Sequence, residues 1–114
     1  MKANVRDFAI RELGCTACFM DGVPYPVQCD KHHLNEGDQP GRKRRGEKFT
    51  VGLCGWHHVG TPFMFHTADE CREAYGPSWH RNKVEFIQRY GDGDALLAVQ
   101  NKRIEQWQTG TLGA

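Results

Sequence analysis

The chain has 114 residues, a net charge of +1 and a mean hydropathy of −0.67, and 39% of its residues are hydrophobic. This size predicts one domain over residues 1–114, with a small core that would gain from cross-links. No apolar run approaches the roughly 20 residues that cross a bilayer, and the first residues lack an apolar signal-peptide core. We therefore expect an intracellular protein without a membrane span. Its overall charge does not indicate which partners it binds.

The first half of the chain predicts few regular elements. Residues 4–13 form a short helix capped by Asn4, with Val5, Phe8, Ala9 and Leu13 as its apolar stripe and Gly14 at its end. Residues 27–31 and 49–53 are expected to be short strands, joined by a polar loop over 35–48. Residues 54–59 open a helix that ends near Gly60.

The second half is predicted to be helical over residues 67–109. Thr67 and Glu70 form a capping box for a helix that ends before Gly76. Ser78 is expected to cap a second helix, and Asp94 a third that ends at Gly110. The predicted fold class is therefore α+β, with an N-terminal helix (1–14), a metal-centred core (15–60) and C-terminal helices.

Two half-sites with metal-ligand spacing flank the predicted strands. Cys15-x2-Cys18 and Cys54-x2-His57 supply three thiolates and one imidazole, a standard closed set for structural Zn²⁺. The alternative, ordinary buried thiols and surface histidines, is disfavoured by the pairing of the two half-sites. Cys29 and Cys71 have no such partner, so we expect buried free thiols. A second site with Cys71 and His66 has weak support.

The histidines that zinc does not use suggest a second, catalytic site. His32, His33 and His58 remain, together with Asp30. If the strands pair as a hairpin and the following helix packs across it, two histidines could hold a divalent ion while a third takes a proton from water. Adjacent residues on a strand point to opposite faces, so one of His32 and His33 must lie at a bend or strand end for both to serve.

These motifs resemble a known family. The C-x2-C, Asp-x-His-His-Leu and Leu-Cys-x2-His-His patterns are similar to those of HNH (ββα-metal) endonucleases. Several stretches resemble, more closely, the phage recombination enhancement function (Ref) family of RecA-dependent nucleases. The stretches that carry the likeness are residues 32–37 (HHLNEG), 41–44 (GRKR), 53–58 (LCGWHH), 76–78 (GPS) and the Lys83-x2-Phe86-x3-Tyr90-Gly91 pattern.

The resemblance implies a zinc-stapled ββα-metal core of the treble-clef type and a role for each histidine. His33 takes the general-base position, and His32 and His58 are ligands of a catalytic Mg²⁺ or similar ion. Asp30 falls where an acidic residue often supports the site. The central Asn of the motif is absent, and Thr50 is a candidate substitute for orienting the base. The family also implies DNA recombination, a RecA-type filament, and a phage or prophage gene acting in the cytoplasm of a bacterial host.

A basic segment between the predicted strands indicates DNA contact. The cations Arg42, Lys43, Arg44, Arg45 and Lys48 would bind phosphates without reading sequence. Arg81, Lys83 and Arg89 either extend this patch or form a solvated helix face, whereas the three tryptophans at 56, 79 and 107 are expected in the core. Two other readings stay open: a non-catalytic zinc finger that binds DNA or protein, and a zinc hydrolase with an open site.

Overall fold

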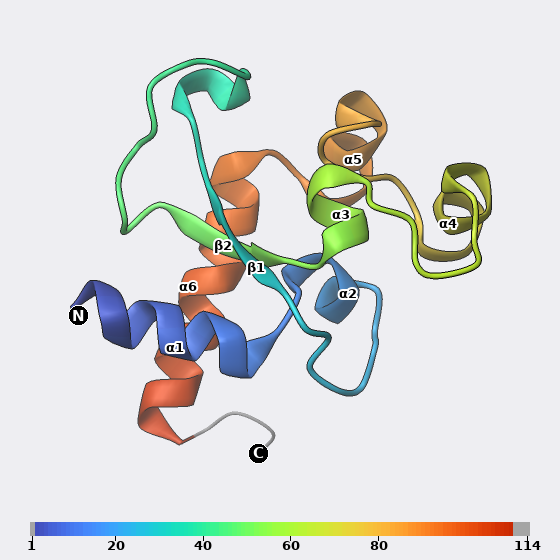
Figure 1. Cartoon of the computed structure of the whole chain (residues 1–114). Coiled ribbons are helices and arrows are strands. Elements are labelled where there is room, and N and C mark those ends of the chain that lie inside the picture. The colour runs from blue at the N-terminus through green and yellow to red at the C-terminus, as the bar shows by residue number, and fades with distance from the viewer. Residues whose placement is uncertain (1, 111–114) are drawn as a thin grey trace.

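The computed structural model describes residues 2–110, and Figure 1 shows a two-stranded hairpin surrounded by helices. In chain order the elements are α1 (Ala3–Leu13), α2 (Thr16–Met20), β1 (Asp30–His33), the 3-10 turn η1 (Glu36–Asp38), β2 (Thr50–Leu53), α3 (Gly55–Val59), α4 (Ala68–Tyr75), α5 (Lys83–Tyr90) and α6 (Gly93–Thr109). The α+β prediction is confirmed. Within this described part, no helix combines the length and apolar character needed to cross a membrane.

The hairpin positions the residues of interest. β1 and β2 are antiparallel, with Asp30 opposite Leu53 and His33 opposite Thr50. Every residue of β2 is buried, because α1, α2, α3 and α6 all contact it. Gly52 permits this close packing: a Cβ there would lie 2.8 Å from Cys29 Sγ and 2.9 Å from Ile10 Cγ2. In Figure 1 α6 passes behind the hairpin, while α3 and α5 lie toward the C-terminal end of β2.

Two of the three tryptophans lie in the core, as predicted. Trp56 is fully buried and its Nε1 donates a hydrogen bond to Gly76 O at 2.8 Å. Trp79 is 7% exposed and packs against Phe86, with ring centroids 5.3 Å apart. Trp107 is half-buried and contacts the ring of Phe8 at 6.0 Å near the surface.

The predicted apolar stripe of α1 is half wrong. Val5 and Phe8 are 38% and 56% exposed, and the buried face contains Arg6 and Ile10 instead. Burial of Arg6 is tolerated because its guanidinium donates hydrogen bonds to Thr50 Oγ1, Thr50 O and Asn101 Oδ1. The helix also begins at Ala3, so Asn4 is not its cap.

Several other boundaries differ from the predictions. α5 begins at Lys83, because Ser78 Oγ accepts from the Arg81 N–H in a separate turn. Asp92, not Asp94, caps α6 by accepting from the Ala95 N–H. The short helix α2 was not predicted, and β1 starts at Asp30 rather than at residue 27, where Val27 O instead accepts a hydrogen bond from the Cys15 N–H. The capping box at Thr67 is confirmed.

Candidate functional site

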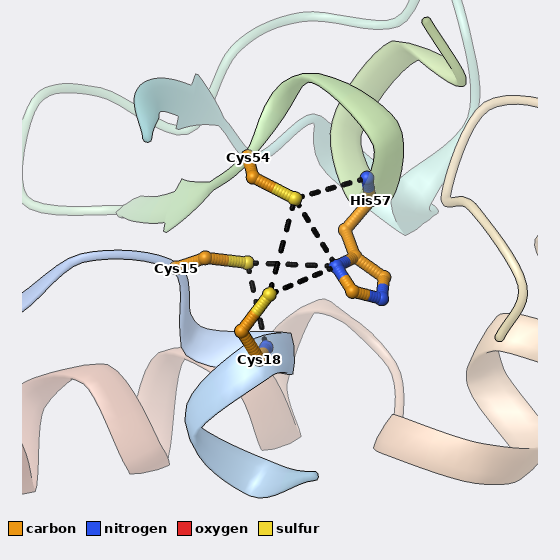
Figure 2. Close-up of side chains that lie close together, drawn as sticks. All are labelled: Cys15, Cys18, Cys54 and His57. Atoms are coloured by element: carbon orange, nitrogen blue, oxygen red, sulfur yellow. Dashed lines mark hydrogen bonds between the residues drawn. The ribbon is translucent and has the colours of Figure 1, made fainter. Parts of the chain in front are cut away.

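The four predicted zinc ligands converge at one point (Figure 2). Cys15 and Cys54 are the N-cap residues of α2 and α3, while Cys18 and His57 lie within those helices. Their ligand atoms all lie within 4.8 Å of one another, and the distances from His57 Nδ1 to the three sulfurs are 3.2–3.7 Å. The edges of a tetrahedral zinc site with ordinary bond lengths are about 3.5–3.8 Å. This buried cluster could hold zinc, consistent with the predicted zinc-stapled core.

Backbone N–H groups at the starts of α2 and α3 contact two of these sulfurs. The Cys18 N–H lies 3.5 Å from Cys15 Sγ, and the His57 N–H lies 3.5 Å from Cys54 Sγ. Hydrogen bonds from Cys15 and Cys18, with further ones from His57, lower the pKa of Cys54. Burial disfavours the charged form of His57, yet hydrogen bonds and charges of Cys15 and Cys54 outweigh it and raise its pKa to about 10. A bound metal ion would therefore replace a proton on this imidazole.

A second layer of residues, missed in the sequence, orients His57. Its Nε2 lies 2.9 Å from Tyr75 O and 3.2 Å from Tyr90 Oη. Donation from Nε2 to the carbonyl leaves Nδ1 to face the three sulfurs. Tyr90 Oη donates to Asp21 Oδ2 at 2.7 Å, and Arg89 donates to the other oxygen of that carboxylate at 3.0 Å. Tyr90 looks in the sequence like any core aromatic at a helix end, so only the fold reveals this role.

The remaining cysteines are buried free thiols, as expected. Burial raises the pKa of Cys29 to about 12, and its Sγ contacts Ile10 O at 3.5 Å. Cys71 is buried in α4, whereas the exposed His66 faces Glu70 at 3.9 Å. Among residues 2–110, the zinc cluster is the one group of three or more such side chains whose ligand atoms converge closely enough for an ion.

The structure brings two of the predicted catalytic histidines into direct contact. His32 Nδ1 of β1 lies 2.9 Å from His58 Nε2 of α3. His32 Nε2 is buried and has no hydrogen-bond partner within the described chain. Burial, followed by the charges of His58, Lys83 and His33, lowers the pKa of His32 to about 3. Burial also lowers the pKa of His58, although the charge of Asp30 opposes it. Both imidazoles are therefore neutral at pH 7, as metal ligation requires.

This histidine pair borders a cavity of about 210 Å³. The residues that line it come from β1, η1, α3, the start of α5 and the segments next to η1 and α5, and include Asn35, Asp38, Val59, Trp79, His80 and Lys83. Backbone hydrogen bonds fix one wall, because the N–H groups of Trp79 and His80 donate to the carbonyls of His57 and His58. The cavity is therefore built between the hairpin and the segment that leads into α5.

His33 lies on the other face of β1, as strand alternation requires. It is the last residue of the strand, and its Nε2 lies 3.1 Å from Glu47 Oε1. Lys31 Nζ, on the same face, binds Glu47 Oε2 at 2.9 Å. The Thr50 hydroxyl donates to Glu47 O and accepts from Arg6, so the group that contacts the His33 ring is Glu47 and not the suggested Thr50. Asp30 is exposed at the start of β1.

The basic residues separate into two groups. Four of the predicted DNA contacts are exposed and form no ion pair within the described chain: Arg42, Lys43, Arg44 and Lys48. Arg45 is half-buried, binds Asp94 at 2.6 Å and lies 4.5 Å from the centre of the Phe49 ring. Of the cations left open, Arg81 donates to Gly60 O, Arg89 binds Asp21 and Lys83 lines the cavity.

Comparison with known proteins identifies a family whose model covers the hairpin, both His-His pairs and the cluster of Cys15, Cys18, Cys54 and His57. The family model described as recombination enhancement, RecA-dependent nuclease matches residues 2–105. A search of curated proteins finds no match. The family match agrees with the resemblance carried by the sequence motifs. The chain therefore belongs to the family of recombination enhancement, RecA-dependent nucleases.

Proposed function

We propose that this protein is a metal-dependent DNA endonuclease of the HNH type, which cuts DNA in a recombination context together with a RecA-type filament. The family match supports the nuclease activity and the dependence on RecA. The observation that carries the HNH assignment is the contact between His32 on β1 and His58 on α3, which join a hairpin and a following helix at the cavity.

The histidine pair fits a divalent ion. Neighbouring ligands of an octahedral ion with bonds of 2.0–2.1 Å are separated by about 2.9–3.0 Å, and the two facing nitrogens are 2.9 Å apart. With Nδ1 of His32 facing the ion, its buried Nε2 would carry the N–H of the neutral imidazole. In this proposal His32 and His58 hold Mg²⁺ or a similar ion, and Asp30, on the same face of β1, supports them. Such an ion would stabilise charge that develops on a phosphate.

His33 is assigned as the general base. Donation from its Nε2–H to Glu47 leaves Nδ1 free to take a proton from a water molecule that attacks phosphorus. Because His33 ends β1, we place the scissile phosphate at this end of the hairpin, within reach of both strand faces. Glu47 then has the orienting role for which the sequence suggested Thr50.

The DNA backbone is assigned to the basic loop. Arg42, Lys43, Arg44 and Lys48 have exposed charges without ion pairs in residues 2–110, so binding phosphates breaks no contact within the protein. Each phosphate neutralised contributes about 0.9 to the logarithmic salt dependence of duplex binding. The cluster of three cysteines and His57 is assigned a structural Zn²⁺ that holds the two short helices against the hairpin.

The test is a cleavage assay with plasmid and branched DNA in Mg²⁺, with and without recombinase filaments. His33→Ala and His58→Ala should each abolish cleavage while zinc content and Tm stay at wild-type values. His66→Ala is the matched control, because this histidine is exposed and distant from the hairpin in the sequence. Unchanged cleavage by His33→Ala would reject the base assignment. Intact DNA binding by a wild-type protein that never cuts would favour a non-catalytic zinc finger.

A further inference from the structure

We infer that Lys83 is a catalytic residue that binds the scissile phosphate in the cavity beside His32 and His58. This inference rests on the proposed nuclease function and assigns a residue whose role the motifs left open. Lys83 is the first residue of α5, and its side chain lines the same cavity as the two histidines.

The Lys83 ammonium group is held in place on two sides. Its Nζ donates a hydrogen bond to Asp38 O at 2.9 Å and lies 3.8 Å from the centre of the Trp79 ring. The second contact is a cation–π interaction with a largely buried ring. An ammonium group has three N–H donors, so two remain for a ligand. A lysine fixed in this way does not have to be ordered when a phosphate arrives.

Lys83 also forms no ion pair in the part of the chain that the structure describes. The carboxylate of Asp38 is near enough to oppose the effect of burial, which nevertheless lowers the pKa of Lys83. That carboxylate is engaged elsewhere, because its Oδ2 accepts from the Gly93 N–H at 2.9 Å. A Cβ at Gly93 would overlap the other oxygen, so glycine permits this arrangement.

A half-buried ammonium group that lines a cavity and has no ion pair among the described residues favours an anionic ligand. The cavity therefore fits an anionic group whose oxygens accept hydrogen bonds, and the proposed function supplies the phosphodiester of DNA. During hydrolysis the water oxygen forms a bond to phosphorus as the bond to the leaving sugar oxygen breaks. The proton of the water goes to His33, and the leaving oxygen takes one from solvent. Lys83 keeps its protons and donates to the non-bridging oxygens, where negative charge grows.

The test separates DNA binding from catalysis in the Lys83→Met variant. Methionine keeps much of the apolar stem over Trp79 and removes the charge. We expect the single-turnover cleavage rate with Mg²⁺ to fall by about 10²–10³-fold, the usual loss for one transition-state donor. The Kd for the same DNA, measured without divalent metal, should change by less than about threefold, because one phosphate contact among several is lost. Lys102→Met, exposed on α6, is the matched control.

The structural alternative is tested in the same samples. Zinc content and Tm of Lys83→Met should match wild type, because a purely structural lysine would lower both cleavage and stability. If the methionine variant is unstable, Lys83→Gln can keep the bond to Asp38 O, and the same loss of rate is required of it. A rate within about twofold of wild type in a folded variant overturns the inference. If His58→Ala abolishes cleavage while Lys83→Met does not, only Lys83 was misassigned; if both variants cleave normally, the proposed site itself fails.

Discussion

Tyr90→Phe tests whether the contacts behind His57 tune the zinc cluster. The Tyr90 side chain is 3% exposed, and its hydroxyl contacts Asp21 Oδ2, Tyr75 O and His57 Nε2 at 2.7–3.3 Å. The substitution removes the hydroxyl and leaves the ring packed on Phe86. We expect zinc to bind more weakly because the imidazole loses part of its orientation, while the four ligands remain.

The magnitude follows from the bonds that are lost. A hydrogen bond to a charged group contributes about 1.5–3 kcal/mol, but Asp21 keeps its bond to Arg89 and His57 keeps its bond to Tyr75 O. We therefore expect the low end of this range. About 1.4 kcal/mol corresponds to a tenfold rise in Kd for zinc, within the 10–100-fold typical of outer contacts in metal sites.

The assay is competition with a chromophoric zinc chelator at fixed pH, combined with thermal unfolding at saturating zinc. Tyr25→Phe is the matched control, because this tyrosine is 66% exposed. A Tyr90→Phe variant that loses stability but binds zinc within about twofold of wild type would refute the reasoning. The hydroxyl would then contribute to packing and not to the metal site.

Three further predictions concern the zinc cluster, the basic loop and the hairpin. The pKa of His57 is raised to about 10, so protonation of His57 should stabilise the metal-free protein fully below the unfolded-state pKa of about 6.5, and this contribution should be lost as the pH rises through 10. Zinc affinity, measured by chelator competition, should increase between these two pH values because the metal displaces the proton of His57. Arg44→Ala should lower the logarithmic salt slope of DNA binding by about 1, whereas Arg45→Ala should leave the slope unchanged and lower Tm, because Arg45 is bound to Asp94. Gly52→Ala should reduce the free energy of unfolding by about 1–3 kcal/mol, measured in urea, because its Cβ would collide with Cys29 and Ile10.

Each of these expectations can fail in a defined way. Zinc affinity that is flat between pH 6 and 9 would show that His57 carries no proton for the metal to displace. Equal salt slopes for the two arginine variants would mean that the exposed and the paired guanidinium groups contact DNA alike. Wild-type stability of Gly52→Ala would show that α1 can move away from β2 at little cost.

The four residues of the candidate zinc cluster could be predicted from the sequence because each pair of ligands lies within four consecutive residues. A C-x2-C or C-x2-H segment places both ligands on one short turn, and the structure forms these turns at the starts of α2 and α3. The Thr67 capping box and the glycine at the end of α1 are local in the same sense. The opposite directions of His32 and His33 also follow from strand alternation alone.

The partners of these residues depended on the tertiary structure. His32 meets His58, Tyr90 reaches His57, Lys83 reaches Asp38 and Arg6 reaches Thr50, each across 26 to 45 positions of the chain. Such pairs follow from the register of the hairpin and from the way that α5 and α6 dock against it, which no local period encodes. The same reason explains the exposure of Phe8. Hydrophobic periodicity and capping residues therefore located α1, α4, α5 and α6, and packing between distant segments decided which of their side chains contribute to the site.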